Sequence, residues 1–227
     1  MKPPLIIWVV IWAQLVALGA ALYPPSRLRG PRLGIAVFLA LSVGSTLASW
    51  LWTQYLHLGN NHFISYVTLP LRGVALLWAI AEWQVIPVLR RTVRLCIPLV
   101  LVCWFVDIVV IGDTGNFSMF GLPVQWLVVL AAALMALVTR SVLSDMSMLR
   151  QGWFWILSGI AIQSATGTVV YIMQHAAIEA GDYAFVDLTH RVKSGIDLIA
   201  LLAITGGLLW PSRPAFSGES SSPVLSR

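Results

Sequence analysis

The sequence predicts an all-α fold: an integral membrane bundle of seven helices, with the N-terminus outside and the C-terminus in the cytoplasm. Three observations support this prediction. The 227-residue chain is 59% hydrophobic and only 10% charged, with a mean hydropathy of +0.86, whereas a soluble domain carries about 25% charged residues. Its apolar residues gather in seven runs, each close to the roughly 20 residues that a membrane-crossing helix needs. Its basic residues lie between these runs, on alternate connections.

The seven runs follow one another with short connections. The first run ends at Pro24-Pro25 and the last ends before Pro211, because proline cannot continue a helix. The third run contains Pro70, which a membrane helix tolerates where its neighbours supply partners for the freed backbone groups. The predicted spans are residues 5–23, 33–56, 63–83, 95–111, 122–138, 153–177 and 186–210.

The positions of the arginines predict the orientation of the bundle. The connections after the first, third and fifth spans and the segment after the seventh span contain arginine, whereas the opposite connections contain no lysine or arginine. The arginines in question are Arg27, Arg29, Arg32, Arg90, Arg91, Arg94, Arg140, Arg150 and Arg213. Since basic connections stay in the cytoplasm, the N-terminus is predicted to lie outside and the C-terminus in the cytoplasm. Residues 1–211 are predicted to form one seven-helix domain. The Ser-, Pro- and Gly-rich residues 212–227 are predicted to form a disordered cytoplasmic tail.

The composition also excludes some classes of protein. A net charge of +5 and a pI of about 9.7 are compatible with nucleic-acid binding, but the basic residues separate apolar runs and form no patch with interleaved aromatic residues. We therefore expect contact with a lipid bilayer and none with nucleic acid. The chain contains no catalytic signature and no metal-ligand motif. The sequence thus favours a protein that is not an enzyme, predicts no metal site and identifies no cofactor.

Polar side chains inside the predicted spans define the candidate site. An ionisable group in hydrocarbon costs at least about 2.5–3.5 kcal/mol, so it usually faces a protein interior or a water-filled cavity. We expect an outward-opening polar cavity between spans three, six and seven. The candidate ligand-binding or buried polar residues are Arg72, Asp107, Gln163, His190, Lys193 and Asp197.

The seventh span has the clearest polar stripe. At about 100° per residue, six of its polar residues fall within an arc of roughly 120°; they are Asp187, His190, Arg191, Ser194, Asp197 and Thr205. Lys193 lies beside this arc, close enough to the outer surface for its ammonium to be hydrated. Arg72 and Asp197 have similar predicted depths, so we expect an ion pair between them, with Asp107 as the competing acid. Such a pair could handle a ligand or ion, or could only fix the packing of the helices; the sequence leaves both open.

Three segments carry a resemblance to a known family. Asn60-Asn61-His62 leads into Leu69-Pro70-Leu71 in the third span, Phe154 to Gly159 opens the sixth span, and the seventh span contains His190 and Lys193. Together they resemble an uncharacterised bacterial family of seven-span membrane proteins, often associated with signalling genes. The resemblance implies a seven-helix fold, the bacterial inner membrane and a signalling context. The family pattern has an acidic residue where this sequence has Arg72, so the resemblance does not supply the chemistry of the site.

These observations lead to one functional hypothesis and several alternatives. We expect a receptor-like sensor of an external small molecule or ion that acts through a partner protein. The alternatives are a structural subunit of a larger membrane complex, in which the polar residues only join helices, a transporter of a small anion or proton, and an intramembrane enzyme. A lysine in the seventh span also suggests retinal, but Arg72 occupies the third-span position where an acidic counterion is expected.

Overall fold

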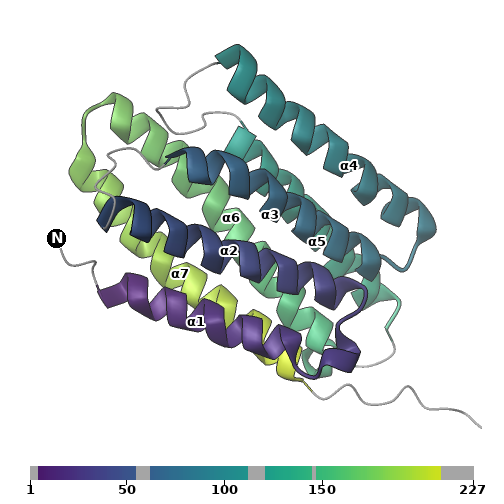
Figure 1. The fold of residues 1–227 in the computed structure, drawn as a ribbon. Helices are drawn as coiled ribbons and strands as arrows, with labels where there is room; N and C mark the ends of the chain where they lie inside the picture. Colours follow the sequence, from purple (N-terminus) through teal and green to yellow (C-terminus); the bar gives the residue numbers. More distant parts are fainter. Residues whose placement is uncertain (1–4, 55–61, 112–120, 145–146, 211–227) are drawn as a thin grey trace, which may run out of the picture.

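The computed structural model describes residues 5–54, 62–111, 121–144 and 147–210. This part of the chain contains seven long helices, labelled in Figure 1, and no strand. The helices are α1 (Leu5–Leu22), α2 (Pro31–Gln54), α3 (His62–Trp83), α4 (Pro87–Val106), α5 (Gly121–Val142), α6 (Gly152–Glu179) and α7 (Tyr183–Leu209). The all-α prediction is therefore confirmed. The predicted tail, residues 212–227, lies outside the described residues.

Most of the long helices have the length and composition of membrane spans. Five segments meet both criteria: Pro31–Trp52, Pro87–Val109, Gly121–Val142, Gly152–Glu179 and Tyr183–Leu209. The apolar part of α1, Trp8–Leu22, is shorter, and α3, which contains Arg72 and Glu82, is not among the five. The apolar helices fit a membrane protein, while the number of spans and their orientation stay predictions.

Two helices begin earlier than the apolar runs suggest. α4 begins at Pro87 rather than Leu95, because proline suits the first position of a helix and arginine has a high helix propensity; Pro87 precedes three arginines here. α7 begins at Tyr183 rather than Val186, since the side chain of Asp182 caps it by accepting a 3.0 Å hydrogen bond from the Phe185 N–H. The longer α7 places its polar residues deeper in the helix than the sequence predicts.

Six of the helices form a closed ring, and α4 lies outside it. The neighbouring pairs are α1–α2, α2–α3, α3–α5, α5–α6, α6–α7 and α7–α1. α4 packs only on α3 and α5 among the well-contacted pairs (Figure 1), and it is the least buried of the five apolar segments. Side chains that point toward the centre of the ring are therefore surrounded by protein, whereas most of α4 faces outward.

A glutamine of α5 joins α4 to α3. The Gln125 side chain is fully buried, accepts a 2.6 Å hydrogen bond from the Trp104 indole N–H, and donates a 2.9 Å bond to the Leu69 carbonyl. Leu69 precedes Pro70, and the close approach needs Gly73, where a Cβ would lie 2.5 Å from Gln125 Cδ. The Gln125 side chain thus ties α5 to α3 directly beside Pro70.

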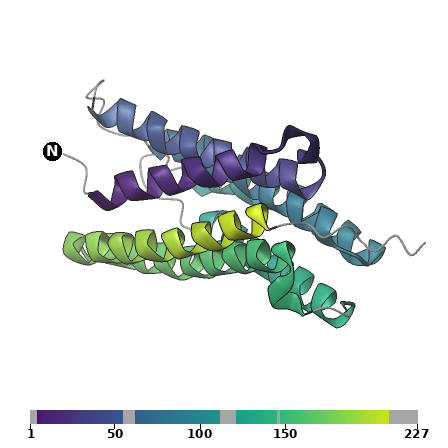
Figure 2. The ribbon, with the colours of Figure 1, turned by 90° about the horizontal axis from the view of Figure 1, so that it is seen from below.

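The α6–α7 pair is packed most closely (Figure 2). A Cβ on Gly207 would lie 2.5 Å from the Gly152 carbonyl oxygen, and one on Gly159 would lie 2.6 Å from the Ala200 carbonyl oxygen. Small residues let membrane helices approach until their backbones touch. This close approach keeps the polar faces of α6 and α7 against one another over many turns.

Replacing Gly207 by alanine is expected to destabilise the protein by about 1–3 kcal/mol, because the added methyl group overpacks the helix contact. Gly206→Ala is the matched control, since a Cβ at Gly206 meets no atom within 4 Å and alanine favours the helix. Thermal unfolding of the purified variants measures both effects. Equal unfolding temperatures for the two variants would contradict the close contact.

Candidate functional site

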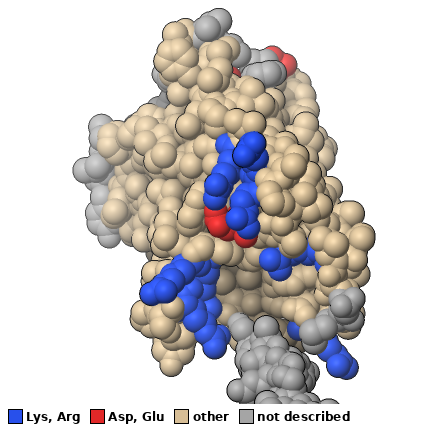
Figure 3. Space-filling model, turned by 90° about the vertical axis from the view of Figure 1, so that its right-hand side faces the viewer, with Lys and Arg blue, Asp and Glu red and all other residues tan. Residues whose placement is uncertain are grey.

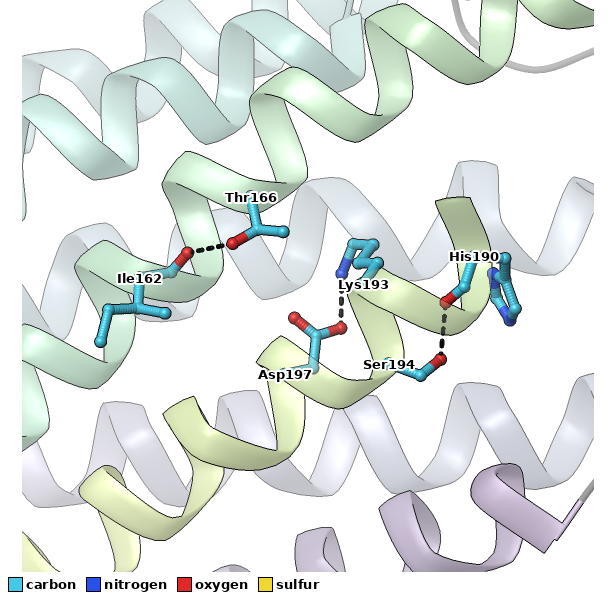
Figure 4. Close-up of polar contacts among 6 residues, drawn as sticks. All are labelled: Ile162, Thr166, His190, Lys193, Ser194 and Asp197. Carbon is cyan, nitrogen blue, oxygen red and sulfur yellow. Dashed lines mark hydrogen bonds and ion pairs between the residues drawn. The ribbon is translucent and has the colours of Figure 1, made fainter. Parts of the chain in front are cut away.

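The central feature of the candidate site is a buried ion pair on α7. Lys193 Nζ lies 2.5 Å from Asp197 Oδ2, one helical turn away, and the two side chains are only 10% and 17% exposed. Both residues lie near the middle of α7, and their side chains meet beside α6 (Figure 4). The prediction that Lys193 is hydrated near the outer surface is wrong, because α7 begins earlier and Lys193 lies deeper.

An aromatic ring of α6 lies beside the pair. Lys193 Nζ is 5.6 Å from the centroid of the Tyr171 ring, within the range at which a ring face attracts a cation. Tyr171 shares one face of α6 with Ser164 and Thr168, and the Thr168 hydroxyl donates a 2.9 Å bond to the Ser164 carbonyl. The polar stripe on this side of α6 therefore lies next to the charged pair on α7.

Arg72 extends toward the same region from α3. Its guanidinium carbon is 5.5 Å from the centroid of the Phe38 ring of α2, and it interacts electrostatically with Tyr171 and Asp197. No ion pair joins Arg72 to Asp197 in the part of the chain that the structure describes, so the predicted pair is wrong. Lys193 forms the ion pair with the Asp197 carboxylate because it lies one turn away on the same helix, whereas Arg72 lies on another helix.

Several buried polar atoms around the ring interior have no hydrogen-bond partner among the described residues. Two of them belong to charged residues at the site: Asp197 Oδ1 and Arg72 Nε. Two others, Gln163 Oε1 and Ser164 Oγ, lie on α6, where both residues are almost fully buried. Buried polar groups are nearly always satisfied by protein or by ordered water. The unpaired atoms of Arg72 and Asp197 thus leave hydrogen-bonding capacity for a bound group.

The other predicted residues are not brought to this cluster. Gln163 lies one turn from Gly167, whose Cβ would touch the Trp126 ring of α5, so it lies on the α5 side of α6. The His190 carbonyl accepts a 2.9 Å bond from the Ser194 hydroxyl, and Figure 4 shows the imidazole directed away from the Lys193–Asp197 pair. His190 still interacts with that pair electrostatically.

Asp107 lies in a different part of the molecule. It begins the π-helical turn Asp107–Ile111 that continues α4, it is 4% exposed, and it takes part in a contact of its own. Because α4 lies outside the ring, Asp107 is not among the groups that interact electrostatically with Arg72. Asp107 is therefore a buried acid at the end of α4, and its predicted competition for Arg72 stays a prediction.

Phe38 is the aromatic residue of the site that the sequence does not indicate. Phe38 and Tyr171 lie within helices that are rich in large apolar side chains, and only the three-dimensional arrangement places them against Arg72 and Lys193. Among the described residues, no group of three or more His, Cys, Asp and Glu side chains could hold a metal ion. The site is thus defined by ammonium, guanidinium, carboxylate and phenol groups.

Comparisons with known proteins provide no further guidance. No protein-family model, no curated protein and no solved structure matches the chain. The resemblance to an uncharacterised bacterial seven-span family therefore stays a prediction, and what the site does has to be argued from its own chemistry.

The charges of the cluster are unequal. Two cations, Arg72 and Lys193, share one carboxylate, Asp197, with which Lys193 already forms an ion pair. A buried charge without full compensation is costly. The cluster is therefore suited to accept one more negative charge close to Arg72.

Removing only one member of the buried pair is expected to be far more damaging than removing both. Asp197→Asn should destabilise the protein by about 3–5 kcal/mol because it leaves the Lys193 charge buried, whereas Lys193→Met combined with Asp197→Leu should be close to neutral. A double-mutant cycle on thermal unfolding measures this difference.

The control is the exposed pair on the same helix. Arg191 Nη2 lies 2.6 Å from Asp187 Oδ2 with the same spacing, but these side chains are 62% and 59% exposed. Asp187→Asn should therefore cost less than about 1 kcal/mol. An equal cost at Asp187 and Asp197 would show that the Lys193–Asp197 pair is not buried in the protein.

Proposed function

We propose that this chain is a seven-helix membrane protein that senses a small anionic molecule from outside the cell and acts through a partner protein. The observation that carries the proposal is the excess positive charge of the Arg72–Lys193–Asp197 cluster, in which the buried Arg72 Nε donor has no hydrogen-bond partner among the described residues. The bacterial inner membrane is part of this proposal and rests on the resemblance described above.

The orientation is supported by the distribution of charge along the bundle. Arginine side chains gather at the end formed by the α1–α2, α3–α4 and α5–α6 connections (Figure 3), and Glu82 is the acidic residue described among them. The opposite end contains Glu179, Asp182 and Asp187, with Arg191 nearby. By the positive-inside rule, the arginine-rich end faces the cytoplasm. With seven spans the N-terminus then lies outside.

An anion is the ligand class that fits the cluster best. Arg72 has donors in a fixed planar arrangement that matches a carboxylate or a similar oxyanion, and Phe38 holds one face of its guanidinium. A bound anion would let Asp197 remain with Lys193 while Arg72 gains a partner of its own. Such a ligand would bind to groups of α3, α6 and α7 and would favour helix positions that bring those groups together.

The orientation predicts which exposed positions an impermeant thiol reagent reaches in intact cells. In a chain with Cys96→Ala and Cys103→Ala, we expect Ala180→Cys to react and Ser26→Cys to react only after the membrane is permeabilised. Both positions are exposed in the structure. Labelling of Ser26→Cys in intact cells would contradict the proposed orientation.

The anion preference predicts that small carboxylates, and not small primary amines of similar size, raise the unfolding temperature of the protein in phosphatidylcholine nanodiscs. Arg72→Gln should weaken the apparent carboxylate affinity about tenfold or more, the loss expected for one charge-assisted hydrogen bond. Arg191→Gln is the matched control because this arginine is exposed on the surface of α7. Stabilisation by amines, or equal losses in the two variants, would contradict an anion site at Arg72.

A native mass spectrum of the protein released gently from its own membrane completes this test. A small bound mass that Arg72→Gln removes supports the sensor. A partner protein of fixed stoichiometry without any carboxylate response favours the alternative, a structural subunit in which the buried charges only join helices.

A further inference from the structure

Two arginines from different helices meet at the end of α3. Arg140 of α5 donates a 2.7 Å hydrogen bond from Nε to the Trp83 carbonyl, and Arg90 of α4 donates a 3.2 Å bond from Nη2 to the Gln84 carbonyl. The two arginines thus bind the carbonyls of consecutive residues where α3 ends, and the Arg140 guanidinium carbon also lies 5.3 Å from the centroid of the Trp153 ring of α6. Carbonyls at a helix end offset part of this positive charge, but no carboxylate contacts either arginine among the described residues.

The residue whose carbonyl binds Arg90 also has a buried side chain. Gln84 is 1% exposed, and neither its Nε2 nor its Oε1 has a hydrogen-bond partner in the described part of the chain. Arg90 Nε is also buried and has no hydrogen-bond partner among the described residues. An unsatisfied buried polar group costs about 1–3 kcal/mol, so three such atoms on two residues that are joined by a hydrogen bond indicate that a polar group from outside the chain completes their hydrogen bonds.

The electrostatics of this end favour an anion as that group. Arg90, Arg91 and Arg94 lie in the first turns of α4, where no acidic residue is present and where the helix dipole disfavours positive charge. The carboxylate of Glu82 lies 2.5 Å from Arg94 and so compensates that arginine alone. Figure 3 shows this end of the bundle, with the arginine side chains gathered around a small acidic patch.

We propose that Gln84, Arg90 and Arg140 form a binding site for a phosphate group. A phosphate offers several oxygens to donors on α4, on α5 and on the residue after α3, whereas a single water would leave the two guanidinium charges uncompensated. This site uses none of the residues of the central cluster and does not depend on the proposed function.

The acceptor atom of Gln84 narrows the chemistry of the bound group. Oε1 needs a donor, which a monoprotonated phosphate supplies from its own hydroxyl. A lipid phosphodiester supplies it from the hydroxyl or ammonium of its headgroup. Both sources are compatible with a site at the end of a membrane bundle, where lipid phosphates lie, and they differ in whether the phosphate is free in solution.

The test uses the full-length protein in nanodiscs and measures its unfolding temperature. One arm raises the fraction of phosphatidylglycerol in phosphatidylcholine, and the other adds inorganic phosphate, at constant ionic strength, to nanodiscs of phosphatidylcholine alone. A rise in the first arm assigns the site to a lipid headgroup, and a rise in the second assigns it to free phosphate. No rise in either arm would overturn the proposal.

Variants separate a built site from general attraction to charge. Arg90→Gln should weaken the apparent affinity for the stabilising phosphate about tenfold or more, whereas Arg91→Gln, the exposed neighbour on the same helix turn, should leave it nearly unchanged. Equal losses at the two positions would overturn the proposal, because they would show a diffuse basic surface.

Gln84→Leu provides the second variant. It keeps the size of the side chain and removes the unpaired amide, so without phosphate it should not lower the unfolding temperature. It should nevertheless abolish most of the stabilisation that phosphate provides in the original protein. An unchanged response to phosphate in Gln84→Leu would place the anion elsewhere and exclude the site.

Discussion

The Lys193–Asp197 pair requires a closed ring of helices around it. A charged pair in the middle of α7 is tolerated only where other helices shield it from lipid, and α1 and α6 pack on either side of α7 while α3 carries Arg72 toward the interior. The ring of six helices, with α4 outside, is the arrangement that meets this constraint. The pair itself supplies little net stability, since its attraction mainly offsets the desolvation of two charges, but it fixes which face of α7 points inward.

The positions of the small residues explain how polar groups on separate helices come within reach of one another. α6 and α7 touch through Gly152, Gly159 and Gly207, so the helix axes are close and the Tyr171 ring reaches Lys193. On the other side of the ring, Gly73 allows the side chain of Gln125 to approach α3 beside its proline. Glycines thus allow close approach at both of the contacts that position the polar groups of the interior.

The sequence predicted the helices well and the pairing of charges poorly, for a physical reason. Apolar runs and prolines predict where helices lie because burial and backbone geometry act locally. They do not predict the early start of α4, because its first turns contain three arginines and precede the apolar run. Arg72 and Asp197 were paired from their similar depth alone. The depth of a residue in the membrane does not show which helices are neighbours in the ring. The nearer partner of Asp197 is Lys193, which lies on the same helix. No pattern in the sequence marked Gln84, since a single glutamine at the end of an apolar run resembles an ordinary loop residue.

α3 connects the two positively charged places in this molecule. It carries Arg72 in the ring interior, and its last carbonyl, with that of the following residue, holds Arg140 and Arg90 at the arginine-rich end. A helix that carries both contacts transmits a displacement along its length, because its backbone hydrogen bonds make it stiffer than the contacts between helices.

If an anion draws Arg72 toward α6 and α7, the Trp83 and Gln84 carbonyls move relative to α4 and α5. The spacing of Arg90 and Arg140 then changes with them. Since α4 is held mainly through α3 and α5, it is the helix whose position at the arginine-rich end is freest to respond, and a phosphate bound between Arg90 and Arg140 would oppose that response. If both proposed sites are occupied and α3 couples them, linkage requires the coupling to act equally in both directions.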